Sequence, residues 1–230
     1  MASHELVKLY IEEQRRILDV FPVDDVCRVV DLIWDAYTQD KTVYAFANGG
    51  GAGLVGNLVC DLSNHPFVFE DKTVPYPDDL RRLKVRNLSV DASMLTGVAN
   101  DLGYAEVFAR PLQTELEARD VVLGISGSGN SENVVRAFEV ARAREAHSIL
   151  ISRGNGGRAR QLCELCLLIP GTSRYPGQTG KNDNNFHFED AVVSITHMLV
   201  GQLCDRVRMA YSRGTYHRRV GHGDGVGILA

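Results

Sequence analysis

Five short, nearly uninterrupted apolar runs place the strongest limit on what this chain can fold into. They are TVYAFA (42–47), VRNLSV (85–90), VVLGIS (121–126), SILIS (148–152) and LCLLIP (165–170). Amphipathic stretches separate several of these runs, notably residues 132–144. Apolar strands that alternate with helices are typical of a parallel sheet covered on both faces. The pattern therefore predicts an α/β fold.

The ends of the chain differ from this middle part. The first forty residues carry two helical patterns with apolar faces, and a long final helix is predicted from Phe188 to about Ala210. The last residues are rich in glycine and have no sustained periodicity. We therefore expect N-terminal helices (1–40) that pack on the domain or in an oligomer, one domain (41–211) and a flexible tail (212–230). Residues 64–84 hold three prolines and predict a surface excursion that serves a site or an interface.

Composition excludes several classes of protein. The 25 Lys and Arg against 29 Asp and Glu give a net charge of −4, which argues against a nucleic-acid partner. No apolar run reaches the roughly 18 residues of a membrane-spanning helix, and the charged N-terminal stretch is unlike a secretory signal. The five scattered cysteines favour reduced thiols and a cytoplasmic protein. We interpret the C-x-x-C of Cys163 and Cys166 as structural, with redox or zinc chemistry as the alternative.

The sharpest local motif is Ser-Gly-Ser-Gly-Asn-Ser at 126–131, between a predicted strand and a predicted helix. In doubly wound folds, ligands collect at the carboxyl ends of strands, where a helix amino terminus offers unpaired N–H groups and partial positive charge. Three hydroxyl groups add donors to an anion, so the loop predicts a site for a phosphate monoester. A turn that only caps a helix is the alternative. The motif does not match the nucleotide-binding G-x-x-x-x-G-K-[S/T], so no nucleotide cofactor is expected. The candidate phosphate ligands are Ser126, Gly127, Ser128 and Ser131.

A second loop of this kind, Asn-Gly-Gly-Gly-Ala-Gly at 48–53, follows the first predicted strand. Its glycines allow the same close approach of backbone to a ligand. Two such loops in one sheet strengthen the prediction of a phosphate site. The second loop adds Asn48, Gly49, Gly50 and Gly51 as candidate substrate ligands.

Several blocks of the sequence resemble the sugar isomerase (SIS) superfamily and, within it, the phosphoheptose isomerases. They are ANGGGAGLVGNLVCDL, MLTGVANDLGYAEVFAR, VLGISGSGNSENVVRAFEVAR and the spaced pair Glu189 and His197, and the resemblance runs from about residue 3 to residue 206. It implies a flavodoxin-like, three-layer fold with a five-stranded parallel sheet sandwiched by helices. It also implies a homotetramer, or a dimer, with sites between subunits. The resemblance assigns Ser126, Ser128 and Ser131 to the phosphate of a small phosphorylated sugar, and Asn48 and Asp101 to the sugar hydroxyls.

An acid–base set follows from the same resemblance. Isomerisation of an aldose to a ketose needs a base of tunable pKa and a proton shuttle. Asp61 lies four residues after Asn57, and Glu189 lies eight residues before His197, so each pair shares a helix face. The resemblance implies that Asp61, Glu189 and His197 transfer protons and bind zinc, with Asn57 at the position of a family histidine. An amide is a poor zinc ligand, so zinc is left open. Gly51 and Gly127 also stand where the family has hydroxyl residues.

Plainer interpretations compete with these assignments. His197 could be a histidine satisfied in the core, and Asp61 could end a helix on the surface. His187 is a second candidate because it lies close to Glu189, whereas His65 beside Pro66 is equally well explained as a solvated side chain.

Together these features predict an aldose–ketose isomerase that converts sedoheptulose 7-phosphate to D-glycero-D-manno-heptose 7-phosphate through an enediol. Asp61 would move the carbon-bound proton, and His197 would assist ring opening and proton transfer to oxygen. Glu189 would serve as a metal ligand or an electrostatic partner. One alternative is a non-catalytic module that binds a phosphosugar or a protein, like the superfamily members that bind a replication initiator. The second alternative is an isomerase that acts on another sugar phosphate.

Overall fold

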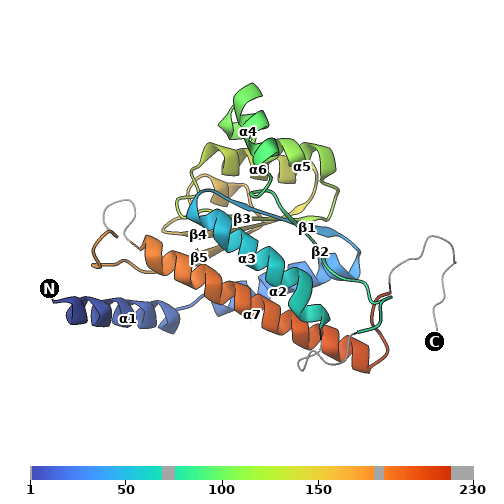
Figure 1. The fold of residues 1–230 in the computed structure, drawn as a ribbon, viewed down its shortest axis with the longest axis horizontal. Helices are drawn as coiled ribbons and strands as arrows, with labels where there is room; N and C mark the ends of the chain where they lie inside the picture. The colour runs from blue at the N-terminus through green and yellow to red at the C-terminus, as the bar shows by residue number, and fades with distance from the viewer. Residues whose placement is uncertain (1, 69–75, 179–183, 219–230) are drawn as a thin grey trace.

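The computed structural model describes residues 2–68, 76–178 and 184–218 of the 230-residue chain. Its centre is a single sheet of five parallel strands in the order β2-β1-β3-β4-β5 (Figure 1). The predicted parallel α/β fold is therefore confirmed. The strands are β1 (Thr42–Ala47), β2 (Lys84–Asn87), β3 (Val121–Ile125), β4 (His147–Arg153) and β5 (Leu165–Ile169).

One strand is shorter than its apolar run. The pattern predicts a strand over 85–90, but β2 ends at Asn87. Ser89 then uses its side chain in place of the backbone, because its Oγ accepts a hydrogen bond from the N–H of Ala47 and donates one to the carbonyl of Ala47, both at 3.0 Å. The side chain of Ser89 thus ends the strand and ties this edge of the sheet to the end of β1.

Helices cover both faces of the sheet, which gives three layers (Figure 1). On one face lie α2 (Val23–Thr38), α3 (Gly50–Asn64) and α7 (Asn185–Ser212), and on the other lie α4 (Ala92–Asp101), α5 (Ala109–Glu115) and α6 (Glu132–Ala143). The first helix, α1 (Ser3–Asp19), extends outward beside the start of α7. Short 3-10 turns cover His65–Phe67, Tyr104–Glu106 and Ala159–Gln161.

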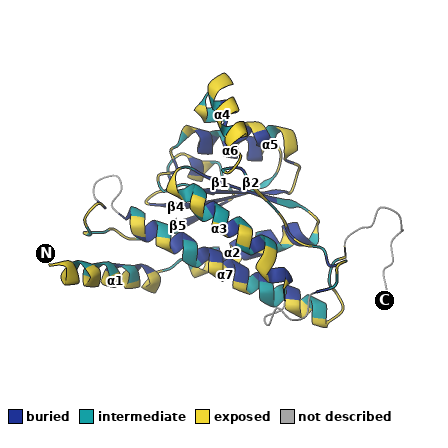
Figure 2. Ribbon diagram, in the orientation of Figure 1, coloured by how far each residue is buried: buried dark blue, intermediate teal, exposed yellow. Residues whose placement is uncertain are grey.

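Strand side chains alternate between two apolar cores. In β1, Val43 and Ala45 face the α2, α3 and α7 layer, whereas Tyr44 and Phe46 face α5 and α6. β3 repeats the pattern, and all five of its residues are buried (Figure 2). Because both faces of the sheet are covered, both sets of alternate side chains must be apolar, which explains the uninterrupted runs in the sequence.

The structure adds detail to the predicted domain organisation at three places. α2 is a full part of the core, since Val29, Val30 and Ile33 have no exposed surface, whereas α1 buries only Glu13 and Ile17. Within the predicted surface excursion, five side chains are buried because they pack under the ends of α2 and α7; they are Pro66, Phe67, Tyr76, Leu80 and Leu83. Residues 69–75 of that segment lie outside the described residues.

The predicted tail is the third of these places. Ser212 is still helical, and residues 213–218 return to the body of the domain. The N–H of Arg81 donates to the carbonyl of His217 at 2.8 Å, and Leu80 forms an isolated bridge with Arg218. Backbone hydrogen bonds therefore hold this part of the tail, and the rest of it, 219–230, lies outside the described residues.

All five cysteines are free thiols, as the sequence predicts. Within the described part of the chain, no helix is both long enough and apolar enough to cross a membrane.

A buried polar cluster attaches α1 to the domain. His187 has no exposed surface, and its Nε2 lies 3.1 Å from Oε2 of Glu13 while its Nδ1 lies 3.0 Å from Oε1 of Gln14. Oε2 of Glu13 also accepts a 2.6 Å hydrogen bond from Ser173, and its Oε1 accepts one from the N–H of Arg174. Burial raises the pKa of Glu13, but these hydrogen bonds outweigh it and leave the pKa below its ordinary 4.5.

This cluster predicts a loss of stability in acid. A carboxyl whose pKa is lowered by folding stabilises the protein above its unfolded pKa, and that contribution disappears as the pH falls through the folded value. Glu13→Gln should lower the free energy of unfolding by about 1–3 kcal/mol at pH 7, and the gap to the unmodified protein should narrow below about pH 4.5. Urea denaturation at several pH values measures this. The control is Glu12→Gln, an exposed neighbour; equal pH profiles for the Glu13 variant and the unmodified protein would contradict the prediction.

Candidate functional site

The two predicted ligand loops meet at the point where the strand order reverses. β1 and β3 are neighbours in the sheet, and their last residues, Ala47 and Ile125, are paired in register. The chain leaves β1 toward α3 on one face and leaves β3 toward α6 on the other. In such sheets a crevice opens at the carboxyl ends of these two strands, and ligands bind there.

A cavity of about 200 Å³ lies at this crevice. It is lined by both loops, by the end of β4 and by the start of α7. Its lining residues are Asn48, Gly50, Gly51, Leu54, Ile125, Ser126, Gly127, Ser128, Ser131, Arg153, Asn185, Phe188 and Glu189. The structure thus brings together the four predicted phosphate ligands of the serine loop (126–131), three predicted ligands of the glycine loop (48–53), and Glu189.

The serine hydroxyls are arranged to donate. Oγ of Ser126 accepts from the N–H of Gly129, and Oγ of Ser128 accepts from the N–H of Asn130, both at 3.2 Å. A hydroxyl has one proton and two lone pairs, so each keeps its proton for a ligand. Ser131 is the N-cap residue of α6, yet its side chain makes no capping hydrogen bond. These contacts favour an anion site over the capping-turn alternative.

A side chain of β4 and the backbone at Gly156 hold the serine loop in shape. The hydroxyl of Ser152, at the end of β4, donates to the carbonyls of Ser126 at 2.7 Å and of Gly127 at 3.3 Å. Gly129 has φ +61°, and a Cβ there would stand 1.9 Å from the carbonyl oxygen of Gly156. Only glycine fits this position, so the loop geometry exists before any ligand arrives.

The glycine loop explains one departure from the family pattern. Gly49 has φ +56° and lets the chain turn from β1 into α3. A Cβ on Gly51 would stand 2.9 Å from Cβ of Ala47, so a serine there would require the backbone to shift. The carboxylate of Glu189 lies over Gly50, 3.6 Å from where a Cβ would be, and accepts a 2.9 Å hydrogen bond from Asn185. A helix amino terminus stabilises a negative charge at this place.

A reciprocal amide pair fixes the side chain of Asn48. Its Nδ2 donates to Oδ1 of Asn133 at 2.9 Å, and Nδ2 of Asn133 donates back at 2.8 Å. The hydroxyl of Tyr104 also donates to Oδ1 of Asn48 at 3.0 Å. Asn133 is buried at the start of α6, so it orients Asn48 toward the cavity from below the loop.

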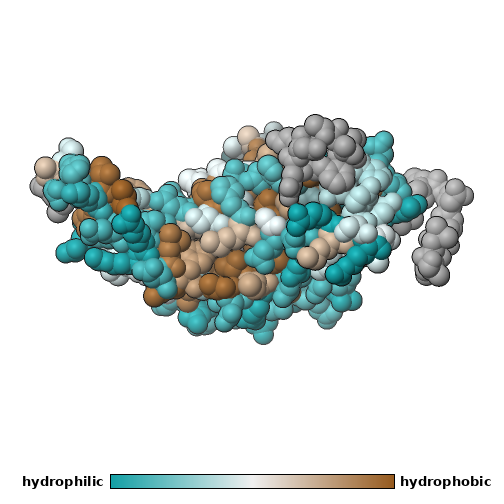
Figure 3. All heavy atoms as spheres, turned by 90° about the horizontal axis from the view of Figure 1, so that it is seen from below, coloured by the Kyte–Doolittle hydropathy of each residue, from teal (hydrophilic) through white to brown (hydrophobic). Residues whose placement is uncertain are grey.

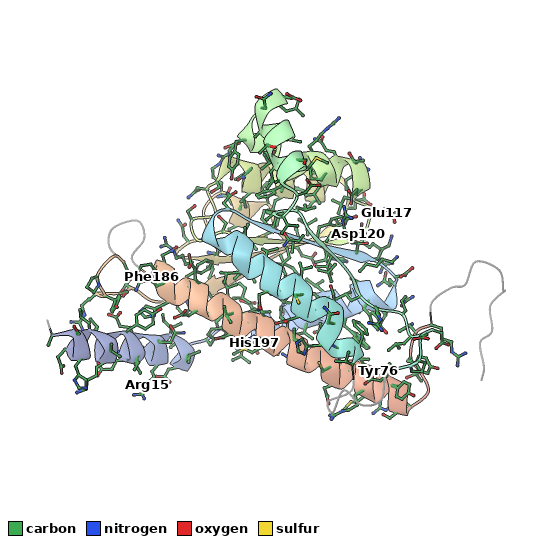
Figure 4. The ribbon with its side chains drawn as sticks, viewed as in Figure 1. Arg15, Tyr76, Glu117, Asp120, Phe186 and His197 are labelled. Atoms are coloured by element: carbon green, nitrogen blue, oxygen red, sulfur yellow. The ribbon has the colours of Figure 1, made fainter. Side chains whose placement is uncertain are left out.

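Asp61 and His197 form a second polar group, further along the same two helices. α3 and α7 run side by side in the same direction (Figure 1), and His197 lies on the part of α7 that passes α3 (Figure 4). Nε2 of His197 is 3.9 Å from Oδ2 of Asp61, and Nε2 of His65 is 3.6 Å from Oδ1. Asn57 donates to Asp61 at 3.3 Å. These contacts make Asp61 the centre of the group.

The structure buries His187 and leaves His197 exposed, which is the reverse of one interpretation of the sequence. The side chain of His197 is 64% exposed, so its interpretation as a core histidine is wrong. His187, the second candidate, is the buried histidine that bonds Glu13. Sequence periodicity did not separate them because both lie on one long helix whose sides face different neighbours.

Four predicted residues lie at three separate places. Glu189 belongs to the serine-loop cavity, whereas Asp61 and His197 lie beyond it along the helices. Asp101 is exposed at the end of α4 and lines a different groove, between α4 and α5. Among the described residues, no group of three or more His, Cys, Asp or Glu side chains converges to hold a metal ion. The donor set predicted for zinc therefore does not come together in the single chain.

Sequence reasoning missed Arg153, together with the supporting residues Asn133, Tyr104 and Asn185. Arg153 is the last residue of β4, is only 8% exposed and lines the cavity. The signal was an arginine that directly follows the apolar strand SILIS. A charged residue at the carboxyl end of a buried parallel strand points to the ligand edge of the sheet.

The close contact of Gly129 with the backbone of Gly156 predicts that the phosphate site tolerates no side chain at position 129. Gly129→Ala should lower the melting temperature and abolish any stabilisation of the protein by added phosphate, because the new Cβ cannot fit. The matched control is Gly53→Ala in α3, where a Cβ meets nothing within 4 Å and helix propensity should favour alanine by about 0.5–1 kcal/mol. Thermal unfolding with and without phosphate measures both. Equal behaviour of the two variants would contradict the assigned geometry.

Comparisons with known proteins bear on the family and the fold of the chain. The chain is 35% identical to the phosphoheptose isomerase of Pelobacter propionicus over 136 residues, which are 59% of this chain and 67% of the relative. It is 31% identical to that of Helicobacter pylori over 170 residues, which are 74% and 79% of the two chains. A solved phosphoheptose isomerase from Francisella tularensis has the same fold, with a TM-score of 0.72 at 21% identity over 90% of this chain and all of the other.

The family model for the SIS domain matches residues 10–152, which include β1 to β3, β4 except its last residue, and both ligand loops. Both ligand loops therefore lie in the part of the chain that the family shares, and the chain belongs to the SIS domain family.

Proposed function

We propose that this protein is an aldose–ketose isomerase of a phosphorylated sugar, and that sedoheptulose 7-phosphate and D-glycero-D-manno-heptose 7-phosphate are its substrate and product. The observation that carries the proposal is the cavity where both ligand loops meet, with acid and histidine side chains further along the same pair of helices. The relatives from Pelobacter propionicus and Helicobacter pylori, both phosphoheptose isomerases, support the choice of sugar.

The phosphate would occupy the serine-loop cavity. Ser126, Ser128 and Ser131 would donate their hydroxyl protons to its oxygens, and the amino terminus of α6 would add its partial positive charge. Asn48, held by Asn133, would donate to a sugar hydroxyl near the phosphate. Binding at this end fixes the sugar so that its other end extends along α3 and α7.

Helix geometry favours a long sugar. Glu189 and His197 are eight residues apart, about 12 Å of helix rise, and helical side chains lean toward the amino terminus, here toward the cavity. An extended chain advances about 1.2 Å per bond, so C2 of a ketose 7-phosphate lies about 8 Å from phosphorus, against about 4 Å for a triose phosphate. A seven-carbon sugar therefore comes nearer than a triose to spanning the separation between the cavity and the group at Asp61.

The chain's own side chains can supply the proton transfers. Asp61 would take the proton from C1 of the open-chain ketose, the C–H electrons would form the C1–C2 double bond, and His197 would give a proton to the C2 oxygen. Asp61 would then give the proton to C2 of the resulting enediol, and the C1 hydroxyl would give its proton back to His197. These two transfers yield the aldose. Asn57 and His65 would orient the carboxylate of Asp61. Glu189 would serve as an electrostatic partner near the sugar.

Zinc stays a prediction. Asp61, Glu189 and His197 do not converge within the described chain, and Asn57 offers only an amide where the family has histidine. For this reason the proton transfers above involve no metal.

The assignment of Asp61 and His197 gives a direct test. Asp61→Asn and His197→Ala should each lower kcat on sedoheptulose 7-phosphate by roughly 10²–10⁴-fold, whereas Ser126→Ala should mainly raise KM. The control is Asp205→Asn, a carboxylate further along α7 that pairs with Arg208. Coupled assays and product identification measure this. Full activity in the Asp61 or His197 variant removes that residue from the mechanism, and phosphosugar-induced stabilisation without turnover, with or without zinc, would favour the non-catalytic module.

We also propose that the protein assembles as a homotetramer, in the cytoplasm. Apolar side chains gather on the face that carries α1 and α7 (Figure 3), and exposed ones include Val7, Ile11 and Leu18 on α1 and Met198 on α7. Subunit packing would cover these side chains.

The proposed assembly predicts that a charge placed on the apolar side of α1 will weaken the association of subunits. Ile11→Glu should convert the oligomer to smaller species, because a carboxylate would be buried without a partner, while exposed Glu12→Gln should leave the assembly unchanged. Light scattering after size-exclusion chromatography measures the mass. If the unmodified protein has the mass of a monomer, the proposed assembly is wrong, and the proposed reaction is unaffected.

A further inference from the structure

One charged side chain in the serine-loop cavity has no part in the assignments above. Arg153 ends β4, is 8% exposed and lines the cavity together with Ser126 and Ser128. Its backbone N–H donates to the carbonyl of Gly127 at 3.4 Å, so the strand end lies against the serine loop. A guanidinium stays protonated at any physiological pH and presents donors that match the oxygens of a phosphate.

A side chain at position 127 would crowd the guanidinium of Arg153. Gly127 does not have a positive φ, so its backbone would accept any residue. Among the described residues, the only atom closer than 3.4 Å to a Cβ placed on Gly127 is Nε of Arg153, at 3.2 Å. The next atoms, on Asn185 and Phe188, are at ordinary contact distances of 3.6 and 3.7 Å. A side chain at 127 would therefore require the guanidinium to shift by a few tenths of an ångström from its position in the cavity.

We propose that Arg153 is a direct ligand of the substrate's phosphate and that Gly127 is the residue that admits it. A charged donor from β4 takes the place of the hydroxyl that a serine or threonine at 127 would supply. The inference rests on the proposed function for the identity of the sugar, while the anion site itself does not depend on it. The ligand class is a phosphate monoester in its dianionic form, because a charge-assisted hydrogen bond strengthens with the charge of the acceptor.

Arg153 variants test the charge. Arg153→Met should raise KM for sedoheptulose 7-phosphate and the dissociation constant of inorganic phosphate by roughly 10- to 100-fold, while kcat changes little. Arg153→Lys, which keeps the charge, should recover much of the loss. The matched control is Arg158→Met, an exposed arginine that pairs with Glu132 at 2.6 Å and does not line the cavity. Calorimetry and phosphate-dependent shifts of the melting temperature measure binding without requiring turnover.

A double-variant cycle tests the shared volume. Gly127→Ser alone should weaken phosphate binding, because the new side chain displaces the guanidinium. In an Arg153→Ala background the same substitution should strengthen binding, because the hydroxyl then meets the phosphate without a competitor. Equal effects of Gly127→Ser in the two backgrounds overturn the inference. Gly127→Ser also carries the test if Arg153→Met does not fold.

The outcomes separate this inference from the proposed function. If Arg153→Met lowers the melting temperature but leaves phosphate binding and KM unchanged, Arg153 is only structural and the inference fails while the isomerase stands. If phosphate binding depends on Arg153 but no sedoheptulose 7-phosphate is converted, the proposed function fails and the inference stands.

Discussion

The parallel pairing of β1 with β3 is the constraint on which the rest of the site depends. Their last residues, Ala47 and Ile125, are in register, and the chain leaves the two strands toward opposite faces. Neither α3 nor α6 then covers the gap between the strand ends, so the two loops face each other across an open crevice. Everything else at the site is arranged around this gap: β4 supports the serine loop through Ser152, and α7 brings Glu189 to the amino terminus of α3.

In the proposed site, neutral groups and one cation would together bind an anion in a protein of charge −4. Hydroxyls and a helix amino terminus can bind phosphate without help from net charge. The close fit of Gly127 with Arg153 and the fit of Gly51 with Ala47 show that departures from a family pattern follow from neighbours in space. A side chain at Gly51 would clash with Ala47, and a side chain at Gly127 would crowd the guanidinium of Arg153.

Local sequence predicted the elements well where the chain is buried on both sides. β1 coincides with its apolar run, and β3, β4 and β5 differ from theirs by one or two residues. The pattern was less informative at β2, an edge strand that Ser89 ends through its side chain, and at α4 and α5, which the periodicity did not identify. It also misjudged residues 64–84, because prolines and charges suggested solvent where Phe67 and Leu80 are buried.

By itself, the sequence determined the parallel α/β fold, the two ligand loops and the residue types of the site. These follow from short-range rules: buried strands must be apolar, and a loop that approaches a phosphate closely needs glycine and hydroxyls. The tertiary structure alone decided which candidates meet. It joined Glu189 to the serine loop, left His197 exposed beside Asp61, buried His187 against Glu13 and brought Arg153 over Gly127. Such contacts join residues far apart in the chain, and they depend on how helices pack on the sheet, which no local spacing encodes.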